Sequence, residues 1–438
     1  MSGGKMRLGD ICTITKGAIG IMKAVSGEYP MITLGEDNKT HNEFQFAAKA
    51  VIIPLVSSTG HGHASMKRVK YQEGKFALGN ILCAVIPKDE NFVLAKYLQI
   101  YLHWNREELL VSQMKGMANV SLPMNRISDV EVNVPSLEKQ KQIVELEQKL
   151  SEKGKQADKL FSDQLTQLTN LNQAILQEAV QGKLVEQNLT DEPATELLKR
   201  IKAEKEKSGK KEKPLPPITP EEIPFEIPDS WVWCRLGDVI DFISGNNFES
   251  ADFYKGNGVK CIKITNAGVN EIIETDDVLP IEFQNRYKQF LVYTDDLVLA
   301  LTRPFIATGL KVSICPTSYN KSLLNQRVAV LRVVNGIYSK YIYQYLSSDI
   351  VLKKYQLMFK GQSQQPNLKK EDVTNLSIPL PPISEQQRIV AEIEKQFAKT
   401  KQLKENIKAN QQATEQLLKA LLAESYEGKE EQTATATT

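Results

Sequence analysis

The sequence lacks the features that mark membrane proteins, secreted proteins and disulfide-rich folds. None of its apolar runs reaches the ~20 residues that a helix needs to cross a bilayer, and the opening Met1-Ser-Gly-Gly-Lys-Met6 carries no apolar signal segment. Its five cysteines stand far apart without any C-x-x-C spacing, which argues against a disulfide framework or a zinc site. We therefore expect a cytoplasmic protein with buried thiols and no membrane contact.

Catalytic motifs are also scarce. The sequence contains neither a G-x-x-x-x-G-K-[ST] phosphate loop nor the Asn/Asp-Pro-Pro-Tyr/Phe motif of amino-methyltransferases. Among four histidines, only His61-Gly62-His63 forms a cluster, and two imidazoles without a third ligand fall short of a zinc site. We expect no catalytic residue, metal or cofactor in this chain. The net charge of +2 is too small to indicate the class of partner.

What is present is an internal repeat of unusually long period. Arg7-Leu-Gly-Asp-Ile11 recurs 228 positions later as Arg235-Leu-Gly-Asp-Val239. Gln140-Lys-Gln-Ile-Val144 recurs 246 positions later as Gln386-Gln-Arg-Ile-Val390. Solenoid repeats have periods of about 20–50 residues, so this pattern indicates a tandem duplication of a variable block followed by a segment of nearly fixed length.

The two variable blocks, 1–135 and 231–380, are typical of mixed α/β (α+β) domains. Four short apolar runs bounded by Gly, Pro, Asp or Asn predict strands at 50–54, 81–86, 297–301 and 328–334. Each block also contains an aromatic-rich segment that predicts a helix, at 96–110 and at 340–355. A glycine-containing loop follows each helix, at Gly116 and Gly361.

The fixed segments predict two long helices. Residues 136–181 and 384–427 contain no proline and are rich in Gln, Glu, Lys, Leu and Ala, which favour helices. At ~1.5 Å per residue the first would extend about 70 Å, and such a helix needs a partner for its apolar stripe. The second shows an apolar repeat every seven residues that begins at Ile393, and the first loses its repeat near Gly154.

The segment between the repeats, 186–230, predicts a shorter helix that starts near Asp191 and a proline-rich extended linker from Pro214 to Pro228. A run of lysines and arginines at 199–213 separates them. This run is either a solvated linker or a basic segment that contacts phosphates. The last residues, 431–438, are expected to be disordered.

Several motifs resemble one family. Leu380-Pro-Pro-Ile-Ser-Glu-Gln-Gln-Arg-Ile389 is similar to the entry of a long helix in the specificity subunits of type I restriction–modification systems, Asp191-Glu-Pro-Ala-Thr-Glu-Leu-Leu-Lys-Arg-Ile201 to their central connection, and Asp229-Ser-Trp-Val-Trp233 to the opening of their second domain. The resemblance covers about 1–430. One departure is Lys139, where the family usually has Glu.

The resemblance implies a function. Each variable block would be a target recognition domain that reads half of an asymmetric bipartite sequence in double-stranded DNA. The helices would pair as an antiparallel coiled coil, set the spacing and offer a surface to two modification subunits. Those subunits would bind S-adenosylmethionine and methylate adenine at N6, and restriction subunits would use ATP and Mg for translocation and cleavage. This chain would be non-catalytic.

This assignment divides the chain into six segments. We expect recognition domain 1 at 1–135, the first spacer helix at 136–185, the connection at 186–230, recognition domain 2 at 231–380, the second spacer helix at 381–430 and the tail at 431–438. Residues inserted after Leu184 are expected to lengthen the spacer.

DNA contacts are expected from polar loops, because Asn and Gln can pair bidentately with adenine and Lys and Arg can bind phosphates or guanine. The candidates are Lys67, Arg68, Lys70, Lys115, Asn119, Thr302, Arg303, Gln326, Arg327, Lys360, Gln362, Ser363, Gln365 and Asn367. The alternative at each position is an ordinary solvated loop. The residues expected at helix or subunit interfaces are Ile143, Leu146, Leu150, Phe161, Leu168, Leu171, Ile175, Ile389, Ile393, Leu403, Ile407, Leu417 and Leu421.

Two other functions remain open on sequence grounds. The chain could be part of an enzyme that both cleaves and methylates, which binding of S-adenosylmethionine to the isolated chain would support. It could also be a scaffold whose duplicated domains bind proteins. A gel shift with random-sequence duplexes, with and without a modification subunit, distinguishes the scaffold from a DNA-binding subunit.

Overall fold

The computed structural model describes residues 4–59, 63–116, 120–207, 214–361 and 365–427. The chain divides into two compact units. Unit 1 comprises residues 1–162 and 408–438, and unit 2 comprises residues 163–407. The expected tail at 431–438 lies outside the described residues. The six segment boundaries expected from the sequence therefore stay a prediction.

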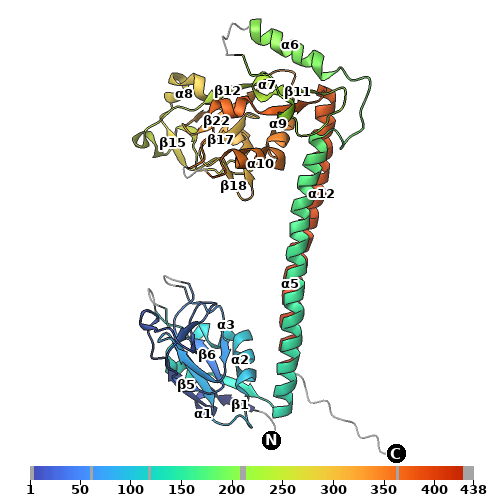
Figure 1. Ribbon diagram of the computed structural model, residues 1–438. Helices are drawn as coiled ribbons and strands as arrows, with labels where there is room; N and C mark the ends of the chain where they lie inside the picture. The colour runs from blue at the N-terminus through green and yellow to red at the C-terminus, as the bar shows by residue number, and fades with distance from the viewer. Residues whose placement is uncertain (1–3, 60–62, 117–119, 208–213, 362–364, 428–438) are drawn as a thin grey trace, which may run out of the picture. The chain divides into compact units, whose positions relative to one another are not determined.

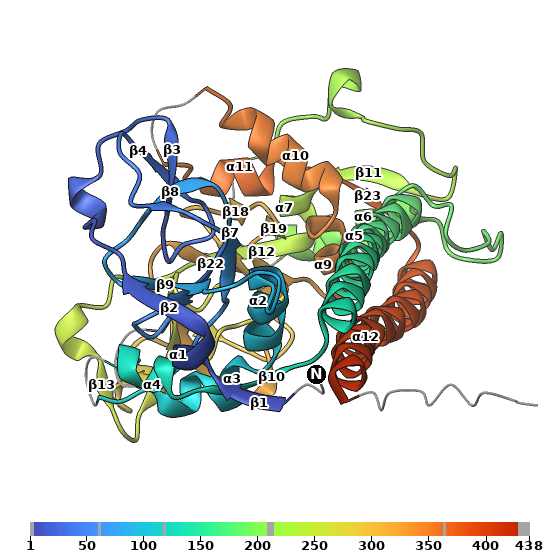
Figure 2. The same ribbon diagram turned by 90° about the horizontal axis from the view of Figure 1, so that it is seen from below.

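The domain of unit 1 contains two four-stranded sheets (Figures 1 and 2). The first has the order β2-β9-β6-β7, formed by Cys12–Lys16, Leu82–Pro87, Ala50–Pro54 and Lys70–Gln72. The second has the order β4-β3-β8-β5, formed by Lys39–His41, Tyr29–Ile32, Lys75–Leu78 and Phe46–Ala47. The helices before the long one are α1 (Leu8–Ile11), α2 (Ala95–Trp104), α3 (Arg106–Leu109) and α4 (Met124–Ser128).

The domain of unit 2 repeats this plan. One sheet has the order β12-β22-β17-β20, formed by Ile240–Ser244, Val328–Val333, Leu297–Ala300 and Val312–Ile314. The other has the order β13-β15-β14-β21-β16, formed by Tyr254–Lys255, Asp277–Leu279, Val259–Ile262, Ser322–Leu324 and Leu291–Val292. A small hairpin adds β18 (Phe305–Ile306) and β19 (Gly309–Leu310). The short helices are α7 (Leu236–Val239), α8 (Phe283–Arg286), α9 (Ser339–Leu346), α10 (Asp349–Met358) and α11 (Lys370–Thr374).

The central strands are apolar throughout because both faces of their sheet are buried. In β6, Val51 and Ile53 pack into a core that contains α2, whereas Ala50 and Ile52 pack into a second core that contains β3 and β8. Residues 297–300 of β17 alternate between two cores in the same way. A strand that is buried on both faces reads as a continuous apolar run, and this explains why the four predicted strands agree with β6, β9, β17 and β22.

The predicted aromatic-rich helices are each broken in two. The segment expected at 96–110 forms α2 and α3, separated at Asn105, whose side chain donates to the Tyr101 carbonyl at 2.9 Å. The segment expected at 340–355 forms α9 and α10, separated at Ser347 and Ser348, and the Ser348 hydroxyl donates to the Tyr345 carbonyl at 2.6 Å. In each break a polar side chain satisfies a carbonyl at the end of the preceding helix.

Each domain is closed by a pair of strands that leads into a long helix. In unit 1, β1 (Gly4–Arg7) pairs with β10 (Glu131–Val134), and α5 (Leu137–Val180) follows. In unit 2, β11 (Val232–Arg235) pairs with β23 (Ser377–Leu380), and α12 (Ile383–Glu427) follows. Both long helices lie within one residue of the proline-free segments 136–181 and 384–427, whereas the spacer helices expected at 136–185 and 381–430 are longer than the helices observed.

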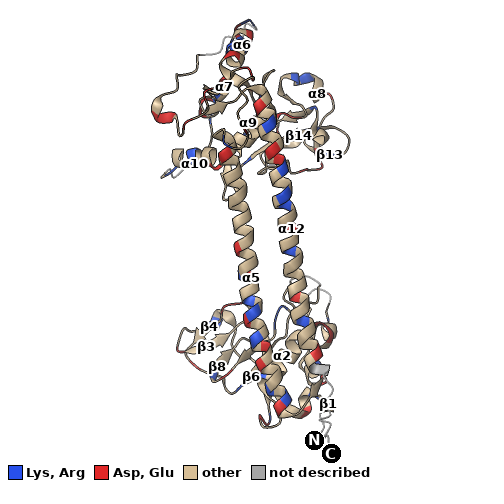
Figure 3. Ribbon diagram, turned by 90° about the vertical axis from the view of Figure 1, so that its right-hand side faces the viewer, with Lys and Arg blue, Asp and Glu red and all other residues tan. Residues whose placement is uncertain are grey.

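Within each unit the two long helices lie side by side in opposite directions (Figures 1 and 3). In unit 1 the Gln411 side chain donates to Asp158 at 3.3 Å, and a Cβ at Gly154 would lie 3.1 Å from Leu418 Cδ1. In unit 2 the Thr400 hydroxyl donates to Asn172 at 2.8 Å. Gly154, where the sequence pattern is interrupted, therefore permits close contact with the opposite helix.

The seven-residue pattern misplaces part of the contact stripe of α12. Ile393 and Thr400 are buried, but Leu403 and Leu417 are 49% and 60% exposed, and Leu421 is also exposed. An α-helix with 3.6 residues per turn drifts by ~20° per heptad relative to a seven-residue repeat. The stripe has moved to Leu418 and Leu422 near the end of the helix, and Leu422 is buried.

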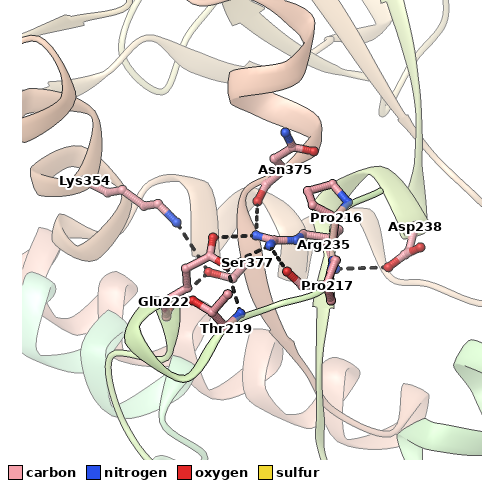
Figure 4. A network of polar contacts seen from close by, with 9 residues as sticks. All are labelled: Pro216, Pro217, Thr219, Glu222, Arg235, Asp238, Lys354, Asn375 and Ser377. Atoms are coloured by element: carbon pink, nitrogen blue, oxygen red, sulfur yellow. Dashed lines mark hydrogen bonds and ion pairs between the residues drawn. The ribbon is translucent and has the colours of Figure 1, made fainter. Parts of the chain in front are cut away.

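The connection between the repeats is attached to the domain of unit 2. Helix α6 (Ala194–Lys207) buries Ala194, Leu197, Leu198 and Ile201. The extended linker is held by Arg235, whose buried guanidinium donates to the carbonyls of Pro216 at 2.9 Å and Pro217 at 2.7 Å and to both oxygens of Glu222 at 2.8 Å (Figure 4). The linker is thus a part of this domain, where the sequence alone indicated only an extended spacer.

Candidate nucleic-acid interface

One edge of the domain in unit 2 gathers most of its predicted contact residues. Strand β17 continues through Leu301 to Thr302 and Arg303, and β22 is preceded by Gln326 and Arg327. The Leu301 N–H donates to the Arg327 carbonyl at 2.8 Å, which places the two strand ends next to one another. The side chains of Arg303, Gln326 and Arg327 are exposed, and Thr302 is half-buried.

The loop after α10 joins this edge through its backbone. Thr302 forms an antiparallel bridge with Asn367, and the Arg303 N–H donates to the Pro366 carbonyl at 2.9 Å. Gln365 and Asn367 are exposed beside the strand ends, and exposed Lys360 lies at the start of the loop. Gln362 and Ser363, also predicted here, lie outside the described residues.

Two arginines at this edge have unusual backbones. Arg303 has φ +48° and Arg327 has φ +71°, in the left-handed region that costs a non-glycine residue roughly 1–2 kcal/mol. Such strain clusters at functional sites, where the surrounding structure holds the residue in place. Here the flanking backbone hydrogen bonds fix both residues with their side chains exposed.

Sequence reasoning missed a second row of amides at this edge. Asn246 and Asn325 form a parallel bridge, and the Gln326 N–H donates to the Asn246 carbonyl at 2.7 Å. Gly245 permits this approach, because a Cβ at that position would lie 1.9 Å from the Asn325 carbonyl oxygen. The available signal was Gly245-Asn-Asn247, which directly follows β12, because a glycine beside a strand is typical of a close backbone contact.

Unit 1 has the corresponding edge with different side chains. Val56 and Lys115 each form an antiparallel bridge with Ser121, as Thr302 does with Asn367. A Cβ at Gly17 would lie 2.2 Å from the Gly79 carbonyl oxygen, and Asn80 is exposed where unit 2 has Gln326. Lys115 is exposed at this edge, whereas the predicted Asn119 lies outside the described residues.

Of the basic cluster predicted in unit 1, Lys67, Arg68 and Lys70, only part is free of contacts within the chain that would compete with DNA. Lys67 is exposed, and Arg68 forms an ion pair with Glu36 at 3.4 Å. The Lys70 ammonium donates to the carbonyls of Thr33 and Gly35 and to the Asn38 side chain, at 3.0, 2.6 and 3.1 Å, and burial lowers its pKa. These contacts favour a structural role for Lys70, which holds the loop 33–38, over the expected phosphate contact.

Burial also shifts the pKa values of His103 and of the five cysteines. Burial, with a smaller contribution from Arg106, lowers the pKa of His103 to about 4, and its Nδ1 accepts the Val69 N–H at 3.2 Å. Burial raises the pKa of all five cysteine thiols, so none is an activated nucleophile.

His61 lies outside the described residues. Among the described residues, no group of three or more His, Cys, Asp or Glu side chains could hold a metal ion.

The basic run after residue 199 is largely paired within the described part of the chain. Lys199 pairs with Glu196, Arg200 with Glu192 and Lys202 with Asp238. The Lys205 ammonium donates to the carbonyls of Gly237 and Ile240, both at 2.8 Å. These contacts favour a structural role for α6 over contact with phosphates; residues 208–213 lie outside the described residues.

The predicted interface residues of the long helices fall into three groups. Those near the start of each helix, or near the end of α5, are buried in the domain cores: Ile143, Ile175, Ile389 and Ile393. The half-buried group contains Leu146, Leu150, Phe161, Leu168 and Ile407. The exposed group contains Leu171, Leu403, Leu417 and Leu421, which are therefore not enclosed in the contact between the two helices of this chain.

The duplicated domain, with one polar edge per copy and a long helix after each, defines a class of protein that presents two related surfaces on one chain. A family model described as the type I restriction modification DNA specificity domain matches residues 4–177 and 228–411. The chain therefore belongs to the family of type I restriction–modification specificity subunits. No described helix is long and apolar enough to cross a membrane.

The curated relatives agree with this family. The chain is 34% identical over 332 residues to the EcoAI specificity subunit of a type I restriction enzyme from Escherichia coli, which covers 74% of this chain and 55% of the relative. It is 29% identical over 283 residues to the EcoEI specificity subunit from the same organism, covering 60% of this chain and 46% of the relative. The chain thus spans about half the length of these relatives.

Solved structures share the fold. A chain in a type I R-M system, solved to describe its complex assembly and conformational transition, aligns with a TM-score of 0.64 and 16% identity over 97% of both chains. The HsdS subunit from Thermoanaerobacter tengcongensis aligns with a TM-score of 0.51 and 16% identity, covering 98% of this chain and 97% of that chain.

Proposed function

We propose that this chain is the non-catalytic subunit that directs a type I restriction–modification complex to an asymmetric bipartite DNA sequence. The observation that carries the proposal is the polar edge that recurs at equivalent positions of both repeats, with different side chains in each. Equivalent backbones with different exposed amides and cations suit two domains that read two different half-sites.

In domain 2, Gln326, Gln365 and Asn367 are the residues that would read base edges, with Asn246 and Asn325 beside them. Arg303 and Arg327 would contact guanine or phosphate, and Thr302 and Lys360 would contact the backbone of the DNA. In domain 1, Lys115, Lys67 and Arg68 would contribute. Each good bidentate pair discriminates against the wrong base by ~1–3 kcal/mol.

The long helices would act as an antiparallel coiled coil that sets the spacing of the half-sites. The contacts of Asp158 with Gln411 and of Asn172 with Thr400 support this pairing. The exposed leucines Leu171, Leu403 and Leu417 would receive the modification subunits, since exposed apolar side chains on a helix favour a protein partner. The part of α5 from 163 to 180 supports this, because Asp163 and Glu178 are its only charged residues (Figure 3).

The chemistry would come from the partners. Two modification subunits would bind S-adenosylmethionine and methylate adenine at N6, and restriction subunits would use ATP and Mg. The experiment is to express the chain with its modification subunit and map the methylated adenines in the host genome. A single bipartite motif is expected, and replacing 235–380 with the domain of a relative should change one half of the motif alone. Simultaneous change of both halves would contradict independent reading.

A further inference from the structure

A buried glutamine occupies the first turn of each long helix. Gln140 in α5 and Gln386 in α12 stand at equivalent positions of the repeat, and both side chains are fully buried. An amide side chain at 0% exposure needs partners for its donor and its acceptor, because an unpaired buried polar group costs roughly 1–3 kcal/mol. The structure supplies both kinds of partner in both units.

In unit 1 the Gln140 amide joins three segments. Its Oε1 accepts the Leu94 N–H at 2.9 Å, and its Nε2 donates to the carbonyls of Phe92 at 3.0 Å and Pro135 at 2.9 Å. Leu94 is the residue that precedes α2. The side chain of the long helix therefore satisfies a backbone donor at the start of a domain helix and carbonyls on either side of the joint.

In unit 2 the Gln386 amide makes the same connection. Its Oε1 accepts the Tyr338 N–H at 2.9 Å, and its Nε2 donates to the Pro381 carbonyl at 2.9 Å. Tyr338 precedes α9 as Leu94 precedes α2. One turn further along each helix, Ile143 and Ile389 are buried in the core of the same domain.

A tyrosine secures the other side of each joint. Tyr97 in α2 donates its hydroxyl to the Asn133 carbonyl at 2.6 Å, and Tyr341 in α9 donates to the Pro379 carbonyl at 2.7 Å. The acceptors lie in β10 and β23, the strands that lead into the long helices. The domain helix, the last strand and the long helix are thus tied together by the same groups in both repeats.

We infer that Gln140 and Gln386 are positioning residues that lock the direction in which each long helix leaves its recognition domain, and so restrict the complex to one DNA spacer length. The inference rests on the proposed function, since a spacer has meaning only if both domains read DNA. A short connection alone leaves bending freedom at residues 135–136 and 381–382. The amide removes that freedom because it accepts from the domain helix and donates to the connection simultaneously.

The test uses the full complex with its modification subunits and duplexes that contain both half-sites at spacer lengths on either side of the native one. Gln140→Met and Gln386→Met keep the volume and remove the amide. We expect methylation at the native spacer to stay within about threefold. The preference for the native spacer over a single base pair more or less should fall by roughly tenfold, equivalent to ~1.4 kcal/mol.

Two controls separate this role from simple stability. Gln142→Met and Gln387→Met change exposed glutamines near the same turns and should leave the preference unchanged. Gln386→Glu keeps an acceptor for the Tyr338 N–H and, in its ionised form, lacks the donor to the Pro381 carbonyl. It replaces the Met variant if that variant does not fold, and at a pH at which the carboxyl is ionised it should show the same loss of spacer preference. Equal loss of methylation at every spacer length would overturn the inference. If the complex that contains the chain without substitutions shows no sequence-specific methylation at all, the proposed function itself fails.

Discussion

The single side chain of Arg235 attaches the proline-rich linker to the domain of unit 2. Its guanidinium is buried and is satisfied by Glu222 and by carbonyls of the linker and of Asn375 (Figure 4). Its repeat counterpart, Arg7, is more than half exposed and bonds to Asp10. Because the two arginines stand in the same four-residue motif, the motif itself does not decide their environment; the linker that covers one of them does.

Replacing Glu222 with Gln should therefore loosen the linker and destabilise unit 2. Removing one partner of a buried ion pair costs about 3–5 kcal/mol, and solvent screening at the partly exposed Glu222 reduces the expected loss to about 2 kcal/mol. Thermal unfolding of the chain at neutral pH measures the effect. Glu226→Gln, which changes an exposed acid in the same linker, is the control and should leave the unfolding temperature unchanged.

The effect of Glu222 should also depend on pH. The Arg235 guanidinium lowers the pKa of Glu222 to about 2, below its usual value of 4.5. A carboxyl with a depressed pKa contributes stability above its unfolded pKa and loses it as the pH falls toward the folded one. The difference in unfolding free energy between the unchanged chain and the Glu222→Gln variant should therefore shrink as the pH falls from 4.5 to about 2. Denaturant unfolding of both chains across this range measures it, and a constant difference would contradict the assignment.

Arg327 allows reading and folding to be separated. Replacing it with Gly removes the strain of its positive φ and should stabilise the chain by about 1 kcal/mol, whereas Arg327→Ala keeps the strain. Both variants should lose affinity for the second half-site in a methylation or binding assay. If the complex with the Arg327→Gly chain methylates the target as well as the complex with the unchanged chain does, this arginine does not contact DNA.

At the scale of elements, the exposed leucines of α12 separate docking from folding. Changing Leu403 and Leu417 together to Gln should leave the thermal unfolding of the chain nearly unchanged, because both side chains are about half exposed or more. The double substitution should weaken co-purification of the chain with the modification subunit. Ile393→Ala, at a fully buried site in the same helix, should instead cost about 2–5 kcal/mol of stability. Undiminished co-purification of the double variant would move the docking surface elsewhere.

The elements differ in how far the sequence predicts them. Strands buried on both faces and helices without proline are predicted well, because local composition reflects their burial directly. The contact stripe of α12 is not predicted well, because leucines lie on both sides of it and the helix drifts away from a seven-residue repeat. The edge residues Thr302, Gln326 and Asn367 could be chosen as polar strand ends, but their grouping depends on backbone pairings between segments that lie far apart in the sequence.

At the scale of the whole molecule, spacer length should follow the length of both helices together. Helix α5 ends at Val180, and Leu184 packs against the core of unit 2. Residues inserted after Leu184 would therefore enlarge the connection and leave the helix unchanged, contrary to the expectation from the sequence. Each long helix must be lengthened within its own span.

One heptad inserted after Asp158 in α5 and another after Gln411 in α12 should lengthen the preferred spacer. Seven residues add ~10.5 Å and preserve the rotation to within ~20°, which corresponds to about three base pairs at ~3.4 Å each. Methylation of a duplex series that differs only in spacer length provides the measurement. The heptad in α5 alone is the control and should reduce activity at every length. An unchanged spacer preference in the double insertion would show that the helices do not set the spacing.

The polar edge of each domain is assembled by main-chain hydrogen bonds. Backbone hydrogen bonds join Leu301 to Arg327, Arg303 to Pro366 and Gln326 to Asn246. The exposed side chains of the edge take no part in these bonds. A substitution there alters what the surface can recognise while the cores on both faces of the sheet keep their packing. Under the proposed function, new specificities would be accessible through single changes that leave the protein folded, so the target of this chain would change faster than its fold.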